Sequence, residues 1–428
     1  MFYDTHTAIT PLFPLDKRGE LKTKILKIIQ KSSNLSGKLS NGTKESFYNI
    51  MKNMNGYYSN LIEGNPTHPL DIEKALNGKY FKDEKKREKV EQNTAHIKTQ
   101  EDIKKRLSEE PDIDVTSKEF ISWIHKKLYE HLDEKFRYIE FKGEKIKIIP
   151  GEIRKRHVKV GNHIAPSEEK LNEFLDFFNK NYSPNNLNLE EKVIAFAASH
   201  HRLAFIHPFL DGNGRLVRLF SYAYAIKIGI DASGIWSISR GLARTRNEYY
   251  SNLSYADQQR QGDFDGRGNL TDKGLYQFCN YFLDTTLNQL DFIYKLLDLN
   301  TFETRMKEML KTKHLTEIHQ KRAFIILKEI FIKGELKRKE LYNLFDDIKP
   351  RTLRDTLIKL NNLKLLISDT HKSPLKLNFT VEDTINLFPD LIPRYLENEI
   401  KIEIKEDKEK EFSIRNTETQ FKNFFVFF

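Results

Sequence analysis

The segment HPFLDGNGRLVR, residues 207–218, joins two stretches whose apolar spacing is typical of helices. LEEKVIAFAASHHRLAFI leads into it from Leu189, and a second helix is expected from about Asn213 to Ile228. The glycine-containing loop is therefore expected at the N-terminus of a helix, where the helix dipole and free N–H groups favour an anion. Helical spacing also dominates the rest of the chain, so we predict a mainly α fold.

The residue types in this loop suit nucleotide phosphate chemistry. His207 can accept a proton near neutral pH, and Asp211 offers a hard oxygen ligand for Mg²⁺. Gly212 and Gly214 bracket Asn213 and let backbone N–H groups approach a phosphate without a Cβ in the way. These groups together predict a catalytic base beside a phosphate and metal site.

Two arginines follow in the same loop. Arg215 and Arg218 are three residues apart on the first turn of the expected helix, so they point to roughly one side and can fork onto phosphate oxygens. A simpler interpretation is a glycine turn with His207 as a core histidine, but it makes every polar group of the segment coincidental. His200 and His201 lie mid-helix outside the motif, and we interpret them as packing or surface residues.

The region before the motif is mostly helical with one interruption. Helical spacing covers residues 20–62 and resumes near Pro69, and the charged run 83–106 is expected to form an exposed helix. From Lys145 to Ile164, polar and apolar residues alternate around Pro150-Gly151. This alternation predicts a β-hairpin within a helical protein.

The C-terminal region has a different pattern. From about Glu317 to Phe379 it runs as helix, turn, helix and short strands, the order of a winged helix. Residues 320–368 carry 12 Lys and Arg against 6 Asp and Glu. Three basic residues are expected on the exposed face of its recognition helix: Arg351, Arg354 and Lys359. DNA binding fits this pattern, and contacts with protein or dimer packing fit it somewhat better.

We therefore expect four parts. They are an N-terminal helical region (1–110), a catalytic core (111–300), a winged-helix-like domain (301–395) and a charged, aromatic tail (396–428). A chain of 428 residues is long enough for two or three domains, and 39% hydrophobic residues are adequate for their cores.

Composition also excludes some classes of protein. The single cysteine, Cys279, rules out an internal disulfide and a zinc cluster. The N-terminus lacks the pattern of a secretory signal, and no run approaches the roughly 18 apolar residues of a membrane span. We expect a cytoplasmic protein without a membrane partner, and we attribute the net charge of +10 to a solvated, Lys-rich surface.

HPFLDGNGRLVR resembles the active-site motif of the Fic family in full, and the resemblance extends over roughly residues 20–300. It implies a helical core that transfers AMP from ATP to a Ser, Thr or Tyr hydroxyl of a protein and releases pyrophosphate. It also implies a role for each motif residue. His207 would deprotonate the hydroxyl, Asp211 would hold Mg²⁺, Gly212, Asn213 and Gly214 would cradle the phosphates, and Arg215 and Arg218 would hold the β- and γ-phosphates.

The segment SNLIEGN, residues 59–65, suggests a built-in inhibitor. Ser59 and Glu63 are four residues apart on one helix face, and Gly64 is typical of a helix end. An ordinary helix cap fits this segment, but it also resembles the Fic inhibitory motif. By that resemblance Glu63 pairs with Arg218, and an arginine held by a carboxylate cannot also hold a γ-phosphate.

Two further segments resemble functional parts of the family. The segment Val158, Lys159, Val160, Gly161 and Asn162 matches the flap that holds the target peptide by strand addition. In RTRNEYYSNL, residues 244–253, Tyr250 is expected to stack on adenine and Tyr249 to lie in the core. Many relatives have Asn where this chain has Asp257, so the adenine contact that the resemblance implies at this position does not carry over directly.

Three functions stay open at this point. The first is AMP transfer restrained by Glu63, with ATP and Mg²⁺ bound and a protein target that can be the chain itself. The second is removal of AMP by the same residues, with Glu63 aligning a water. The third is a DNA-binding regulator whose Fic domain senses nucleotide without catalysis, and the intact His207 and Asp211 argue against it. A homodimer is open in each case.

Overall fold

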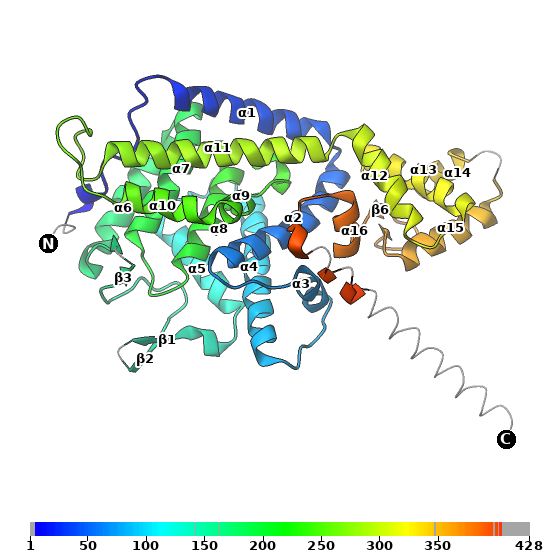
Figure 1. Cartoon of the computed structure of the whole chain (residues 1–428), viewed down its shortest axis with the longest axis horizontal. Coiled ribbons are helices and arrows are strands. Elements are labelled where there is room, and N and C mark those ends of the chain that lie inside the picture. Colours follow the sequence, from blue (N-terminus) through cyan, green and yellow to red (C-terminus); the bar gives the residue numbers. More distant parts are fainter. Residues whose placement is uncertain are drawn as a thin grey trace. The chain divides into compact units, whose positions relative to one another are not determined.

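The computed structural model describes residues 5–141, 143–161, 163–345, 348–396, 399–400 and 402–404, and most of them are helical (Figure 1). The prediction of a mainly α fold is confirmed. The chain divides into two compact units. The larger comprises residues 1–67 and 74–295, and the smaller comprises 68–73 and 296–428.

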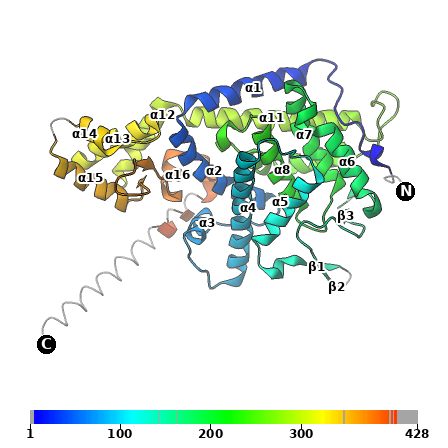
Figure 2. The ribbon, with the colours of Figure 1, turned by 180° about the vertical axis from the view of Figure 1, so that it is seen from behind.

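The helices of the larger unit pack around α8, whose residues are buried along most of its length. α1 and α11 run side by side in both views (Figures 1 and 2), and Lys24 Nζ on α1 donates to Asn280 and Asp284 on α11 at 2.6 Å each. The bounds are α1 Glu20–Lys38, α2 Asn41–Ile62, α4 Glu84–Glu109, α5 Lys118–Glu130, α6 Leu171–Tyr182, α7 Leu189–Ile206, α8 Asn213–Lys227, α9 Ile238–Arg244, α10 Arg246–Ala256 and α11 Asp272–Leu296, and α3 spans Pro69–Leu76. Short 3₁₀ turns lie at His6–Ile9, Glu134–Arg137, Glu168–Lys170, Pro184–Asn186 and Ala232–Gly234.

The expectation of an exposed helix over 83–106 is wrong in part. The helix exists as α4, and Asp83 caps it by accepting from Lys86 N at 2.7 Å. Its central residues are buried, however, because it packs against α2, α5 and α8. Its high overall charge hid an apolar and small-residue stripe that includes Ala95, Ile97 and Ile103.

The single hairpin expected around Pro150-Gly151 is also wrong. Two short hairpins flank this point: β1 (Tyr138–Phe141) pairs with β2 (Glu144–Lys147), and β3 (Lys159–Val160) pairs with β4 (His163–Ile164). The backbone N–H of Gly151 donates to His125 Nδ1 at 2.9 Å, and a Cβ there would lie 2.9 Å from the carbonyl of Ser122. Pro150 and Gly151 do form a turn, since Glu152 N donates to Ile149 O at 3.0 Å, but the strands pair on either side of it and not across it. Gly151 is also a close-contact point against α5.

The smaller unit follows the predicted order of helices and strands. It contains α12 Leu299–Lys311, α13 Glu317–Lys333, α14 Arg338–Asn343, α15 Pro350–Asn362, the pair β5 Leu366–Ile367 and β6 Lys376–Leu377, and α16 Val381–Leu387. On α15, Arg351 and Arg354 are exposed as expected, whereas Lys359 is half-buried. A winged-helix role and DNA binding stay predictions.

Most of the predicted tail, residues 396–428, lies outside the described residues. Among the described helices, none combines the length and the apolar run that crossing a bilayer requires.

Candidate active site

The motif loop borders a cavity of about 770 Å³ in the larger unit. The structure brings most of the predicted site residues to this one cavity. Its lining includes His207, Asp211, Gly212, Asn213, Gly214, Arg215, Arg218 and Tyr250, together with Glu63 and the flap residues Val160 and Gly161.

His207 lies where α7 ends and the loop begins. Its backbone is left-handed, with φ 49°, and its N–H donates to Leu203 O at 3.2 Å. The buried Arg154 donates from Nε to the carbonyl of His207 at 2.8 Å and from its backbone N–H to Pro208 O at 2.9 Å. Burial, followed by the proximity of His163 and Arg154, lowers the pKa of His207 to about 4. The imidazole is therefore neutral at pH 7 and able to accept a proton.

Asp211 is positioned by three neighbours. Tyr129 donates from its hydroxyl to Asp211 Oδ2 at 2.7 Å, Arg215 Nη2 lies 3.7 Å from the same oxygen, and His125 donates from Nε2 to the backbone carbonyl at 3.2 Å. Burial raises the pKa of Asp211, but Arg215 and Tyr129 outweigh it and leave the pKa below its usual value. The carboxylate is ionised at neutral pH.

The donor set at the cavity fits a magnesium nucleotide better than a protein-enclosed metal. Among the described residues, no group of three or more His, Cys, Asp or Glu side chains could hold a metal alone. Mg²⁺ at phosphate sites usually takes one or two carboxylates and completes its shell with phosphate oxygens and water. The Asp211 side chain, 49% exposed and ionised, fits the first of these positions.

The phosphate-cradle residues differ in what they contribute. Asn213 accepts from Phe209 N at 3.0 Å and donates to Phe209 O at 2.8 Å, so its buried side chain braces the loop. Gly212 has φ 77°. A Cβ on Gly214 would collide with Glu63 Oε1. The carboxylate of Glu63 therefore occupies the space beside the backbone where a phosphate is expected.

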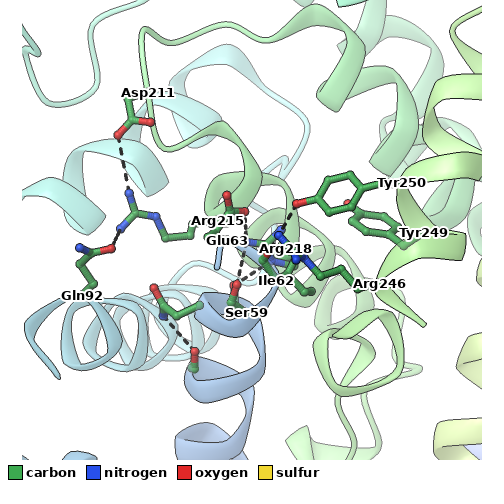
Figure 3. A network of polar contacts seen from close by, with 12 residues as sticks. Ser59, Ile62, Glu63, Gln92, Asp211, Arg215, Arg218, Arg246, Tyr249 and Tyr250 are labelled. Carbon is green, nitrogen blue, oxygen red and sulfur yellow. Dashed lines mark hydrogen bonds and ion pairs between the residues drawn. The ribbon is translucent and has the colours of Figure 1, made fainter. Parts of the chain in front are cut away.

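Arg218 is buried and makes three contacts with the inhibitory segment (Figure 3). It donates from Nε to Ser59 Oγ at 2.8 Å, and from Nη2 to Ser59 O at 3.0 Å and to Glu63 Oε1 at 2.5 Å. Burial lowers the pKa of Arg218, but the charge and hydrogen bond of Glu63, together with Tyr249 and Tyr250, outweigh it and raise the pKa. The predicted pair Glu63–Arg218 is thus present in the structure, although 155 residues separate its partners.

Tyr250 and Arg246 of α10 hold the end of α2. Arg246 donates from Nε to Ile62 O at 2.8 Å, and the Tyr250 hydroxyl donates to the same carbonyl at 3.3 Å (Figure 3). The Tyr250 ring is 41% exposed at the cavity, whereas Tyr249 is buried and its hydroxyl lies 2.8 Å from His200 Nε2. Tyr250 therefore offers an aromatic face for a base, and His200 is a core residue.

Asp257 lines the same cavity and is paired with histidines. Its Oδ1 lies 3.2 Å from Nε2 of the buried His201, and its Oδ2 lies 3.6 Å from Nδ1 of His163 on β4. His201 is therefore a core residue too. Its Nδ1 accepts from Arg202 at 2.9 Å.

The flap residues lie at the mouth of the site. Lys159 and Val160 are exposed, Val158 is half-buried, and Asn162 lies outside the described residues. In the part of the chain that the structure describes, β3 and β4 pair only with each other, so each keeps a free edge to which a peptide strand could add.

Some site residues have no signal in the sequence. Arg154 and His163 lie in the alternating segment 145–164 and Tyr129 lies on α5, but neither pattern points to the active site, and packing alone brings these residues to the loop. Arg246 is different, because it lies four residues before Tyr250 and so shares its helix face.

The sequence is similar to those of known Fic proteins. Residues 115–225 match the sequence profile of the Fic/DOC family. The chain contains a Fic domain. It is 28% identical over 146 residues to "Protein adenylyltransferase Fic" of Drosophila yakuba, and 31% identical over 113 residues to that of Nematostella vectensis. The matches cover 34% and 26% of this chain, and 26% and 24% of those relatives.

Solved structures give similar names. A Fic family protein from Desulfovibrio desulfuricans aligns with 83% of this chain and 96% of its own, at 14% identity and a TM-score of 0.48. Fic-1, residues 134–508, from C. elegans aligns with 63% of this chain and 71% of its own, at 17% identity and a TM-score of 0.47.

Proposed function

We propose that this protein transfers AMP from ATP to a hydroxyl group of a protein and that Glu63 restrains the reaction. The observation that carries the proposal is the convergence of a neutral His207, an ionised Asp211 and two arginines on one cavity. A volume of about 770 Å³ is within the usual range for ligand sites. The names of the relatives support the same reaction.

The proposed reaction is a direct substitution at the α-phosphorus. The target hydroxyl oxygen forms a bond to the α-phosphorus as His207 takes its proton, and the bond to the β-phosphate bridging oxygen breaks to release pyrophosphate. Arg215 and Arg218 hold the departing phosphates, and Tyr250 stacks on the base. Asp211 would hold Mg²⁺, which would neutralise phosphate charge.

The test is incubation of the purified protein with labelled ATP, Mg²⁺ and cell lysate. We expect His207-dependent label on the chain itself or on a lysate protein, stronger in Glu63→Gly than in the parent. The absence of label in both would contradict AMP transfer.

Asp211→Asn is expected to lower AMP transfer in the Glu63→Gly variant by about a hundredfold, since an amide oxygen is a weaker Mg²⁺ ligand than a carboxylate. The readout is the rate of labelling against Mg²⁺ concentration. Tyr129→Phe is the matched control, because it removes one hydrogen bond to Asp211 but keeps the carboxylate. An Asp211→Asn variant with the parent's rate and Mg²⁺ dependence would refute the role.

The pH dependence follows from the lowered pKa of His207. The base must be unprotonated, so the enzyme is fully active above this pKa. Activity is lost as the pH falls through it. With a pKa of about 4, labelling by Glu63→Gly should stay nearly constant from about pH 6 to 8 and decline only toward pH 4. Initial rates across this range decide the point. A decline centred near 6.5, the ordinary imidazole value, would show that burial does not act as inferred.

A further inference from the structure

His163 connects the flap to the body of the larger unit. It is on β4, and its side chain is 11% exposed. Its Nε2 lies 2.8 Å from the carbonyl oxygen of Phe205, and because a carbonyl only accepts, Nε2 carries the hydrogen and donates. Its Nδ1 faces Asp257 Oδ2 at 3.6 Å. The ring therefore lies between the last turn of α7 and the residue that follows α10.

Both contact points are themselves fixed. Phe205 is in the last turn of α7, two residues before His207, and its ring lies 4.6 Å from that of His163. Asp257 follows α10 and contacts the buried His201. His201 in turn accepts from the buried Arg202, which donates from Nη2 to Pro11 O at 2.8 Å. The flap thus contacts a buried polar network.

The flap needs such an attachment, since its own sheet is small. β3 and β4 contribute two residues each, and a hairpin of this length does not hold its position alone. A peptide that adds to its edge is placed only as accurately as the flap is. An error of about 1 Å at a reacting group can cost a hundredfold in rate.

We propose that His163 is a positioning residue that fixes the flap to the end of α7 and thereby places the target hydroxyl against His207. This inference rests on the proposed AMP transfer. Asp257 Oδ2, 3.6 Å from Nδ1, lies beyond hydrogen-bond distance and borders the other side of the His163 ring.

The position of His163 has an electrostatic consequence as well. The titratable groups facing His207 are His163 from β4, Arg154 from the segment before β3 and Asp211 from the motif loop. The first two lower the pKa of His207 and Asp211 raises it. His163 itself faces Asp257, which His201 and Arg202 also contact or approach. Removal of His163 should therefore raise the pKa of His207 and move the acid decline of activity to higher pH.

The experiment compares His163→Ala and His163→Gln in the Glu63→Gly variant. Glutamine can keep a donor to Phe205 O but cannot be protonated, whereas alanine provides no donor. Two products are measured from labelled ATP: AMP on protein, and free AMP formed when water replaces the target hydroxyl. Water needs no flap, so it reports on the rest of the site. Melting temperature confirms that each variant is folded.

For His163→Ala we expect protein labelling to fall ten- to hundredfold relative to free AMP, with the KM for ATP unchanged. His163→Gln should restore labelling, and both variants should show the acid decline at higher pH. Equal losses of both products, or labelling by His163→Ala equal to that of its parent, would overturn the inference.

Hydrogen exchange of the flap amides gives a readout that needs no catalysis. We expect residues 158–165 to exchange several-fold faster in His163→Ala and at the parent's rate in His163→Gln. Unchanged exchange in His163→Ala contradicts the anchoring role. A Glu63→Gly parent without any His207-dependent label would count against AMP transfer instead, and the exchange result would still decide the role of His163.

Discussion

His207→Ala is expected to abolish AMP transfer. A positioned general base contributes about 10² to 10⁴ in rate, and the lowered pKa of this histidine keeps its imidazole unprotonated at pH 7. The loss should fall on the rate and not on nucleotide binding, because the predicted phosphate contacts come from other residues. Labelling in the Glu63→Gly variant, with and without His207, is the measurement.

The control must show that His207→Ala loses AMP transfer because the base is missing and not because the protein is misfolded. The backbone of His207 contributes to the site, since its carbonyl accepts from Arg154 and its left-handed conformation turns the chain. Alanine keeps the carbonyl, so the melting temperature should change little. Asparagine tolerates φ above zero better than alanine, which makes His207→Asn a useful second variant. Undiminished labelling in both variants would remove His207 from the mechanism.

The candidate active-site loop can be predicted from the sequence because its groups are contiguous. The residues from His207 to Arg218 lie on one loop and one helix turn, so their spacing alone places them together. The pairing of Glu63 with Arg218 could be anticipated only through the family resemblance, because no local rule joins residues from α2 and α8.

Other features could not be predicted, for physical reasons that differ. Arg154 and His163 contact backbone carbonyls. Every residue has a backbone carbonyl, so the accepting residues show no pattern in the sequence. The burial of α4 is not evident from the sequence because its charged residues outnumber the buried residues that pack on α2 and α8. The single hairpin is a wrong expectation because Pro150-Gly151 forms a turn whose flanking segments do not pair with each other, and its glycine also allows a close approach to α5.

Glu63→Gly is expected to raise AMP transfer by about tenfold or more. Glu63 acts on the site in two ways: it holds Arg218 at 2.5 Å, and it fills the space beside Gly214. A hydrogen bond between charged groups contributes about 1.5 to 3 kcal/mol, and 1.4 kcal/mol corresponds to a factor of ten. Glu63 is 36% exposed, so the lower end of this range applies to the Glu63–Arg218 pair alone. Freeing the space beside Gly214 for a phosphate should increase the activation further.

Glu63→Gln separates the two effects. It keeps the size of the side chain and an oxygen that can accept from Arg218, but it loses the charge. We expect Glu63→Gln to activate transfer less than Glu63→Gly does, because the amide still fills the space beside Gly214. The double variant Glu63→Gly with His207→Ala must be silent, which shows that the gain comes from this site.

A stability measurement tests the same contact without relying on a target. Removal of Glu63 leaves the buried guanidinium of Arg218 with Ser59 but without its carboxylate. The loss of one partner from a buried pair is destabilising, so the nucleotide-free variant should melt at a lower temperature than the parent. Saturating ATP with Mg²⁺ should stabilise the variant more than the parent, since phosphate replaces the missing charge. Equal stabilisation of both proteins would show that Glu63 and the phosphates do not compete.

The same substitution distinguishes inhibition from removal of AMP. If Glu63 only restrains transfer, a target that already carries AMP should lose it equally slowly with Glu or Gly at position 63. If Glu63 aligns a water, release of AMP from that target should require Glu63 and should be lost in Glu63→Gly and Glu63→Gln alike. Lower labelling by Glu63→Gly in every assay, with no change in AMP release, would leave Glu63 as a structural cap of α2. We expect higher labelling, because the carboxylate occupies the position and holds the arginine that the phosphates of ATP need.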